Sequence, residues 1–177
     1  MIKFISVLAI WMSICSCTTY LDKGQSIHND HLDFNYTKNY NEFIYKSNTN
    51  SVADNQLFLK THFSINLPKK IKFWIISSNE FFFEYRGKQI IYINSGYKNE
   101  KSIGNWSIQE PTSEKIYSLL RSYWNSRNYK EEKLTFEKAV SNSKIYTDGN
   151  VLILLYNIKQ ENFAKYMELV KSFKYLN

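Results

Sequence analysis

The chain has little of the residue types on which most enzymes and disulfide-stabilised domains depend. Its 177 residues include two cysteines, three histidines, five glycines and two prolines. Both cysteines, Cys15 and Cys17, lie near the start, and residues this close in sequence do not readily meet disulfide geometry. The chain after Cys17 therefore contains neither a disulfide nor a cysteine-based metal site.

Motifs that organise catalysis are absent as well. We find no G-x-S-x-G, no glycine-rich phosphate loop, no H-E-x-x-H and no C-x-x-C. His62 follows a strand-like pattern, where a histidine is more often a surface residue than a catalytic base. Glu80 and Glu84 are spaced to share one strand face, and ordinary solvated charges are the simpler interpretation of this carboxylate pair. We expect no catalytic residues, no metal site and no cofactor.

The positive charge of the chain is spread out rather than gathered. The formal net charge is +7, and the longest basic cluster is Lys69, Lys70 and Lys72, beside Pro68. Nucleic-acid-binding proteins usually carry such residues on one face, whereas a short basic run is usually a solvated turn. We therefore expect no nucleic-acid partner.

One histidine pair suggests a metal site, but its surroundings do not support the suggestion. The run His28-Asn29-Asp30-His31 is followed by Asp33, and His-x-x-His spacing places two rings on one face of a helix. No helix signal is present here, and no further ligands follow at a useful spacing. Polar surface residues are the expected interpretation.

The first residues carry the clearest signal in the sequence. Lys3 is followed by an apolar run from Phe4 to Ile14. A membrane-spanning helix needs about 20 apolar residues, so this run is too short to span and suits a secretory signal peptide.

The run Ile14-Cys15-Ser16-Cys17 that ends this segment resembles the lipobox of bacterial lipoproteins. The resemblance implies a diacylglyceryl thioether on Cys17, cleavage after Ser16 and acylation of the new N-terminus. Such an anchor holds a protein firmly, since each buried CH₂ contributes about 0.8 kcal/mol. We expect the protein at the cell envelope, lipid-anchored to the inner or outer membrane of a bacterium.

Composition divides the chain into three parts. Residues 1–16 are the expected signal peptide, and residues 17–56 are rich in polar residues, which predicts a lipidated N-terminus and flexible tether. Aromatic residues between Phe34 and Tyr45 are numerous enough to dock on the domain as an edge strand or a short helix. Residues 57–177 are the expected single α+β domain.

Within this domain, apolar periodicity predicts strands, a helix, strands and a final helix. Alternation places Phe81, Phe83 and Tyr85 on one strand face, and a turn follows at Gly87-Lys88. The expected strands are 57–67, 71–76, 81–86, 90–94, 144–147 and 150–158, with a weaker strand at 134–136, and the expected helices begin near Thr112 and Gln160. This order favours an antiparallel sheet packed by two helices.

Two segments at the ends of the domain resemble the PsbP-like family. They are Phe63-Ser64-Ile65-Asn66-Leu67-Pro68 and Leu169-Val170-Lys171-Ser172-Phe173-Lys174. In that family an early strand ending in proline and a terminal helix bracket the sheet, so the resemblance implies a PsbP-like sandwich. It does not define an activity.

Two functions are consistent with these observations. The first is a non-enzymatic binding or accessory module at the envelope, whose partner is an unknown protein or glycan. For it, Trp74 and Trp106 are candidate contact residues, with core packing as the alternative. The second is a small envelope hydrolase whose site assembles from scattered residues such as His62 and Glu84. A pocket that unites these two residues would favour the hydrolase.

Overall fold

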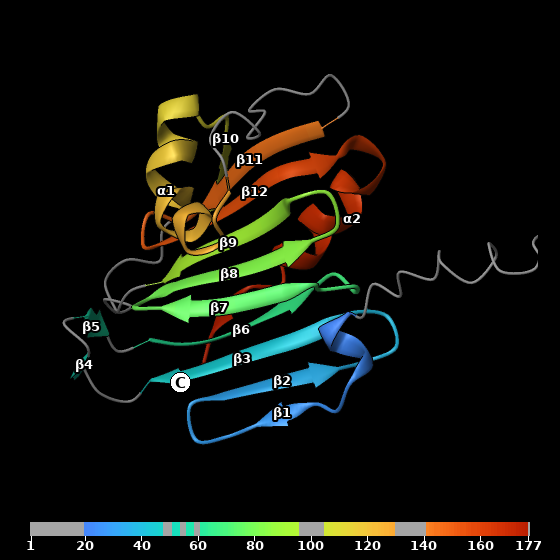
Figure 1. Cartoon of the computed structure of the whole chain (residues 1–177), viewed down its shortest axis with the longest axis vertical. Coiled ribbons are helices and arrows are strands. Elements are labelled where there is room, and N and C mark those ends of the chain that lie inside the picture. Colours follow the sequence, from blue (N-terminus) through green and yellow to red (C-terminus); the bar gives the residue numbers. More distant parts are fainter. Residues whose placement is uncertain are drawn as a thin grey trace, which may run out of the picture.

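The chain folds as two antiparallel sheets and two helices (Figure 1). The computed structural model describes residues 20–47, 51–53, 56–58, 61–95, 105–129 and 141–176. The α+β class expected from the sequence is confirmed. The weak strand expected at 134–136 lies outside the described residues.

The N-terminal part of the chain builds most of the five-stranded sheet. Its order is β1-β2-β3-β6-β13, with every neighbouring pair antiparallel. A 3-10 turn, η1 (Leu21–Lys23), precedes it. The strands are β1 (Ile27–His28), β2 (Leu32–Tyr36), β3 (Asn41–Ser47), β6 (Thr61–Leu67) and β13 (Lys174–Tyr175).

The six-stranded sheet comes from the middle and the end of the chain. Its order is β10-β11-β12-β9-β8-β7, again antiparallel throughout. Its strands are β7 (Phe73–Ser77), β8 (Glu80–Tyr85), β9 (Gln89–Ser95), β10 (Ser107–Gln109), β11 (Ser141–Thr147) and β12 (Val151–Lys159). A separate two-stranded ribbon consists of β4 (Ser51–Ala53) and β5 (Gln56–Phe58).

The main core lies between the two sheets. Alternate residues of β2, β3 and β6 point inward, as the period of two in a strand requires, and meet the inward residues of β8, β9 and β12. Phe43 is fully buried, with its ring centroid 5.2 Å from that of Phe83. Phe63 lies 5.1 Å from Phe81 in the same layer. Aromatic rings thus fill much of the space between the sheets.

Helix α1 (Ser113–Ser126) covers the outer face of the six-stranded sheet (Figure 1). Thr112 caps it, since its hydroxyl accepts a hydrogen bond of 3.2 Å from the backbone N–H of Lys115. Its buried face contains Ile116, Leu120, Tyr123 and Trp124. This second core also contains Phe82, Tyr92, Leu154 and Tyr156 from the sheet. Helical spacing in the sequence predicts a buried face formed by the four helix residues above and Leu119, and Leu119 is partly buried.

Helix α2 (Gln160–Val170) closes one side of the sandwich. It packs on both β12 and β6, one strand from each sheet, and buries Tyr166, Met167 and Val170 in the main core. Phe173 follows the helix and stacks on Phe63 at 5.0 Å. The helix therefore holds the two sheets together at that side.

The hairpin turns follow from local sequence, with one difference in detail. Gly87 and Lys88 both have positive φ, as the tight turn between β8 and β9 requires. Between β11 and β12, Gly149 has a φ of +92°. Asp148 instead keeps a negative φ and accepts hydrogen bonds from the backbone N–H groups of Asn150 and Val151. The Asp-Gly sequence of this second turn predicts positive φ at both residues, and for Asp148 this prediction is wrong.

Two expectations about architecture are corrected. A single sheet packed by two helices was expected, but the structure has two sheets packed on one another. Residues 17–56 were expected to form a flexible tether, but residues 20–47 contain three strands of the five-stranded sheet. Leu32, Phe34, Phe43 and Tyr45 alternate along β2 and β3 and are buried. The physical reason is that this apolar face of the strands needs burial.

A truncation tests this corrected boundary. Removing residues 1–56 deletes β1 to β4 and with them Phe34 and Phe43, both fully buried. Loss of a buried phenylalanine side chain costs about 3–5 kcal/mol each, comparable to the whole stability of many domains. We expect residues 57–177 to lose the cooperative thermal transition that residues 18–177 show by circular dichroism. Equal, sharp transitions for the two chains would contradict the structure.

Candidate functional site

A pocket of about 510 Å³ opens at the end of the sandwich where the chain enters the fold. Four segments that are distant in sequence surround it. They are the entry to η1, the turn from β6 to β7, the turn from β8 to β9 and the start of α2. Its lining residues are Tyr20, Pro68, Lys69, Lys70, Tyr85, Arg86, Gly87, Gln89, Lys159, Glu161, Asn162, Lys165 and Tyr166. We call this hollow the basic pocket.

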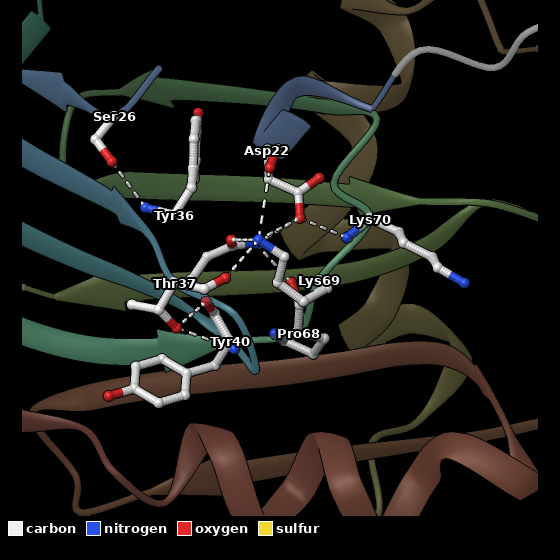
Figure 2. Close-up of polar contacts among 9 residues, drawn as sticks. Asp22, Ser26, Tyr36, Thr37, Tyr40, Pro68, Lys69 and Lys70 are labelled. Atoms are coloured by element: carbon white, nitrogen blue, oxygen red, sulfur yellow. Dashed lines mark hydrogen bonds and ion pairs between the residues drawn. The ribbon is translucent and has the colours of Figure 1, made fainter. Parts of the chain in front are cut away.

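Lys69 lies at the centre of a polar cluster beside this pocket (Figure 2). Its Nζ donates hydrogen bonds to the backbone oxygen of Thr37 at 2.9 Å and to Oδ1 of Asn41 at 3.0 Å. The same nitrogen lies 3.3 Å from Oδ2 of Asp22. Partners from two segments, η1 and the connection from β2 into the start of β3, therefore converge on one ammonium group, and we call this arrangement the Asp22–Lys69 cluster.

Asp22 ties η1 to the turn before β7. Its Oδ2 accepts hydrogen bonds from the backbone N–H of Lys70 at 2.7 Å and from Nδ2 of Asn41 at 3.2 Å. Its side chain is only 2% exposed, so its charge depends on these partners. A backbone hydrogen bond of 2.9 Å from Leu21 to Ile71 runs alongside. The cluster thus fixes where the chain enters the fold.

Lys70 has the backbone conformation that this cluster requires. Its φ is +73°, which is uncommon for a residue with a side chain. The conformation directs its N–H to Asp22, while its side chain extends away from the cluster (Figure 2). The ammonium group of Lys70 is therefore left exposed at the basic pocket.

The rim of the basic pocket carries more positive than negative charge. Five cationic residues line it, namely Lys69, Lys70, Arg86, Lys159 and Lys165, against one carboxylate. Lys69 is paired with Asp22, and Nζ of Lys159 lies 3.6 Å from Oε1 of Glu161. The remaining three have no ion-pair partner within the described part of the chain. Chemically, the pocket is suited to an anion.

Two tyrosines form the inner wall of the pocket. Tyr85 is fully buried, and its hydroxyl has no hydrogen-bond partner among the described residues. Burial raises the pKa of Tyr85 well above its usual range, and burial raises the pKa of Tyr166 to about 12. Both hydroxyls are therefore neutral at physiological pH and remain able to donate a hydrogen bond.

His62 and Glu84 do not come together. His62 alternates on β6 with the buried Thr61 and Phe63, so its side chain faces away from the main core. Glu84 lies on the outer face of the six-stranded sheet, beneath α1. Both sheets thus separate the two residues, and neither of them lines the basic pocket.

Glu84 is instead a fully satisfied buried carboxylate. It accepts hydrogen bonds of 2.6 Å from the hydroxyl of Tyr123 and 2.7 Å from that of Tyr129, with Nε of Arg127 3.6 Å away. The guanidinium of Arg127 also lies 4.0 Å from the ring centroid of Phe73. These contacts fasten the end of α1 to the sheet.

Glu80 shares the strand face of Glu84, as its spacing predicted. Its Oε1 accepts a hydrogen bond of 2.7 Å from the hydroxyl of Tyr92. Burial and this hydrogen bond raise the pKa of Tyr92 above its usual range. Each carboxylate thus has its own tyrosine partner, an arrangement that is structural.

One histidine of the N-terminal pair, His28, makes a side-chain contact at the surface. His28 lies on β1 with its Nδ1 3.2 Å from Oδ1 of Asp33, whose Oδ2 accepts from Lys46 at 2.5 Å. The hydrogen bond from Lys46, then that from His28, lowers the pKa of Asp33. Asp33 thus pairs with Lys46 and contacts His28. Within the described ranges, no group of three or more His, Cys, Asp or Glu side chains could hold a metal ion.

The two tryptophans considered as contact residues pack against the core. Trp74 lies 5.7 Å from the ring of Phe34, and Trp106 stacks on Tyr146 at 4.2 Å. Both belong to the periphery of the main core. The structure therefore supports the alternative interpretation of these residues, core packing.

The proposed lipidation site, Cys17, lies outside the described residues, as does the signal segment before it. Of the helices that the structure describes, neither is long and apolar enough to cross a membrane. The basic pocket itself was missed in the sequence. Its one visible signal was the run at Lys69 and Lys70, which looked like an ordinary solvated turn because its partner Asp22 is distant in sequence.

The Asp22–Lys69 cluster can be tested against a matched surface pair. Replacing Asp22 with Asn leaves Lys69 without its buried counter-charge and should lower the free energy of unfolding by roughly 2–4 kcal/mol. The same substitution at Asp33, which pairs with the half-exposed Lys46, should cost less than about 1 kcal/mol. Urea denaturation measures both. Equal losses would show that the cluster does not fix the entry of the chain.

Comparisons with models of known protein families, with curated proteins and with solved structures found no match. The resemblance to the PsbP-like family therefore rests on the two end segments alone. In the structure these segments are neighbours, since Ser64 on β6 pairs with Lys174 on β13. The function has to be argued from the geometry of the chain itself.

Proposed function

We propose that this protein is a lipid-anchored lipoprotein of the bacterial cell envelope that acts by binding and not by catalysis. The lipobox-like run ending at Cys17 supports the anchor. The observation that carries the binding role is the basic pocket, which combines an open hollow with exposed cations. A protein or glycan of the envelope that bears acidic groups would complement it.

The arrangement of titratable groups also favours binding. Catalysis needs a nucleophile or an acid–base group held next to stabilising donors in one site. His62 and Glu84 lie on opposite sides of the sandwich, and Glu84 is occupied by Tyr123 and Tyr129. The alternative of a small envelope hydrolase would need a different set of residues, since these two cannot act on one substrate.

The anchor is tested by changing the cysteine that would carry it. Cys17→Ala should abolish labelling by a fatty-acid analogue and leave a precursor that is not cleaved, because the thioether forms on that sulfur. Cys15→Ala is the matched control and should be labelled and processed normally. For both variants, gel mobility measures cleavage of the precursor, and labelling measures attachment of the lipid. Continued labelling of the Cys17→Ala protein would remove the basis for the anchor.

The hydrolase alternative, as considered for His62 and Glu84, is tested by replacing these two residues. His62→Gln and Glu84→Gln keep side-chain size, and Glu84→Gln keeps acceptor capacity for Tyr123. We expect both variants, when folded and anchored, to restore the phenotype of a gene deletion as the unchanged protein does. A folded His62→Gln protein that is inactive in this assay would favour the hydrolase.

A further inference from the structure

The basic pocket lies very close to the expected anchor. Tyr20 lines the pocket and follows Cys17 by only three residues. A fully extended chain covers at most about 3.6 Å per residue, so the link spans no more than roughly 11 Å. Because the Asp22–Lys69 cluster holds the chain two residues further on, the pocket cannot move far from the lipid.

Three exposed cations are available at this position. Lys70, Arg86 and Lys165 line the pocket, and each lacks an ion-pair partner within the described ranges. Nearby negative charge is already engaged, since Asp22 pairs with Lys69, and Glu161 lies close to Lys159. The pocket thus has positive charge to offer to a phosphate.

The side chains nearest the anchor suit a membrane surface. Leu21 is 41% exposed, one of only two large hydrophobic residues so exposed in the described part of the chain. It adjoins Tyr20, and a tyrosine beside an apolar residue is favoured where headgroups meet hydrocarbon. The backbone of Leu21 is held by its hydrogen bond to Ile71, while much of its side chain remains exposed.

We propose that the basic pocket binds the phosphate groups of anionic phospholipids in the membrane that carries the anchor. The inference rests on the proposed function, because the lipid on Cys17 is what brings the pocket to the bilayer. It assigns the ligand of this pocket as a lipid headgroup phosphate, in place of an acidic protein or glycan, and orients the domain with the pocket facing the membrane. Phosphate contacts with lysine and arginine supply the attraction.

Amine labelling of the anchored protein tests this orientation. The mature lipoprotein is placed in vesicles of phosphatidylcholine alone, or in vesicles that also contain phosphatidylglycerol, and treated with an acetylating reagent. Lys70 and Lys165 should react on the order of fivefold more slowly in the anionic vesicles. Lys115 and Lys174, exposed elsewhere on the fold, are internal controls and should react equally in both. Mass spectrometry measures the extent of acetylation at each lysine.

A charge variant distinguishes phosphate binding at the basic pocket from general electrostatic attraction between the protein and the anionic vesicle. Arg86→Gln should bring the labelling rate of Lys165 in anionic vesicles towards its rate in neutral ones, because the phosphate loses one of its three partners. Arg121→Gln on α1 removes the same charge away from the pocket and should leave that rate unchanged. Equal effects of the two variants would overturn the pocket as the site.

The remaining outcomes also decide the proposal. Equal labelling of Lys70 and Lys165 in both vesicles would overturn it, and so would equal protection by inorganic phosphate in neutral vesicles, which would indicate a soluble-anion site. The mass of the same preparation reports the lipid on Cys17. If that lipid is present and protection is absent, this inference fails and the anchored binding role stands. If the lipid is absent, the proposed function fails and this inference falls with it.

Discussion

The packing of aromatic rings between the two sheets is the constraint on which the rest of the structure depends. Phe43, from the N-terminal part of the chain, lies 5.2 Å from Phe83 and 5.8 Å from Phe81, both on the other sheet. Each such ring buries roughly 150–250 Å² and gains further from edge-to-face contact. Without strands β2 and β3, the inner face of the six-stranded sheet would meet water.

This constraint also determines where the pocket lies. Because β2 and β3 must pack on the core, the chain has to enter the fold beside the turn from β6 to β7, where Asp22 meets Lys69. The contact is polar because it closes the end of the sandwich, where backbone groups such as the oxygen of Thr37 need partners. The basic pocket lies at this closed end of the sandwich. Tyr20, which lines the pocket, is only three residues after Cys17 in the sequence.

Local sequence patterns predicted the structural features that depend on residues close together in the chain. The start of α1 near Thr112, the turn at Gly87 and the inward face of β8 depend on contacts within a few residues, and all are confirmed. The second sheet and the pocket depend on pairings between distant segments, such as Phe43 with Ile65 across β3 and β6. The aromatic residues between Phe34 and Tyr45 indicated docking on the domain as an edge strand or a short helix. The polar residues around them concealed the alternation of Leu32, Phe34, Phe43 and Tyr45 along two strands.

Native-state amide hydrogen exchange tests the central claim most directly, because it measures the stability of each strand in the intact chain. On residues 18–177, the amides of β2 and β3 should show the same free energy of opening as those of β8, β9 and β12. They should also lose protection at the same denaturant concentration. Rapid exchange of β2 and β3 beside a protected six-stranded sheet would contradict the account, since it would show that the N-terminal segment is a tether and not part of the core.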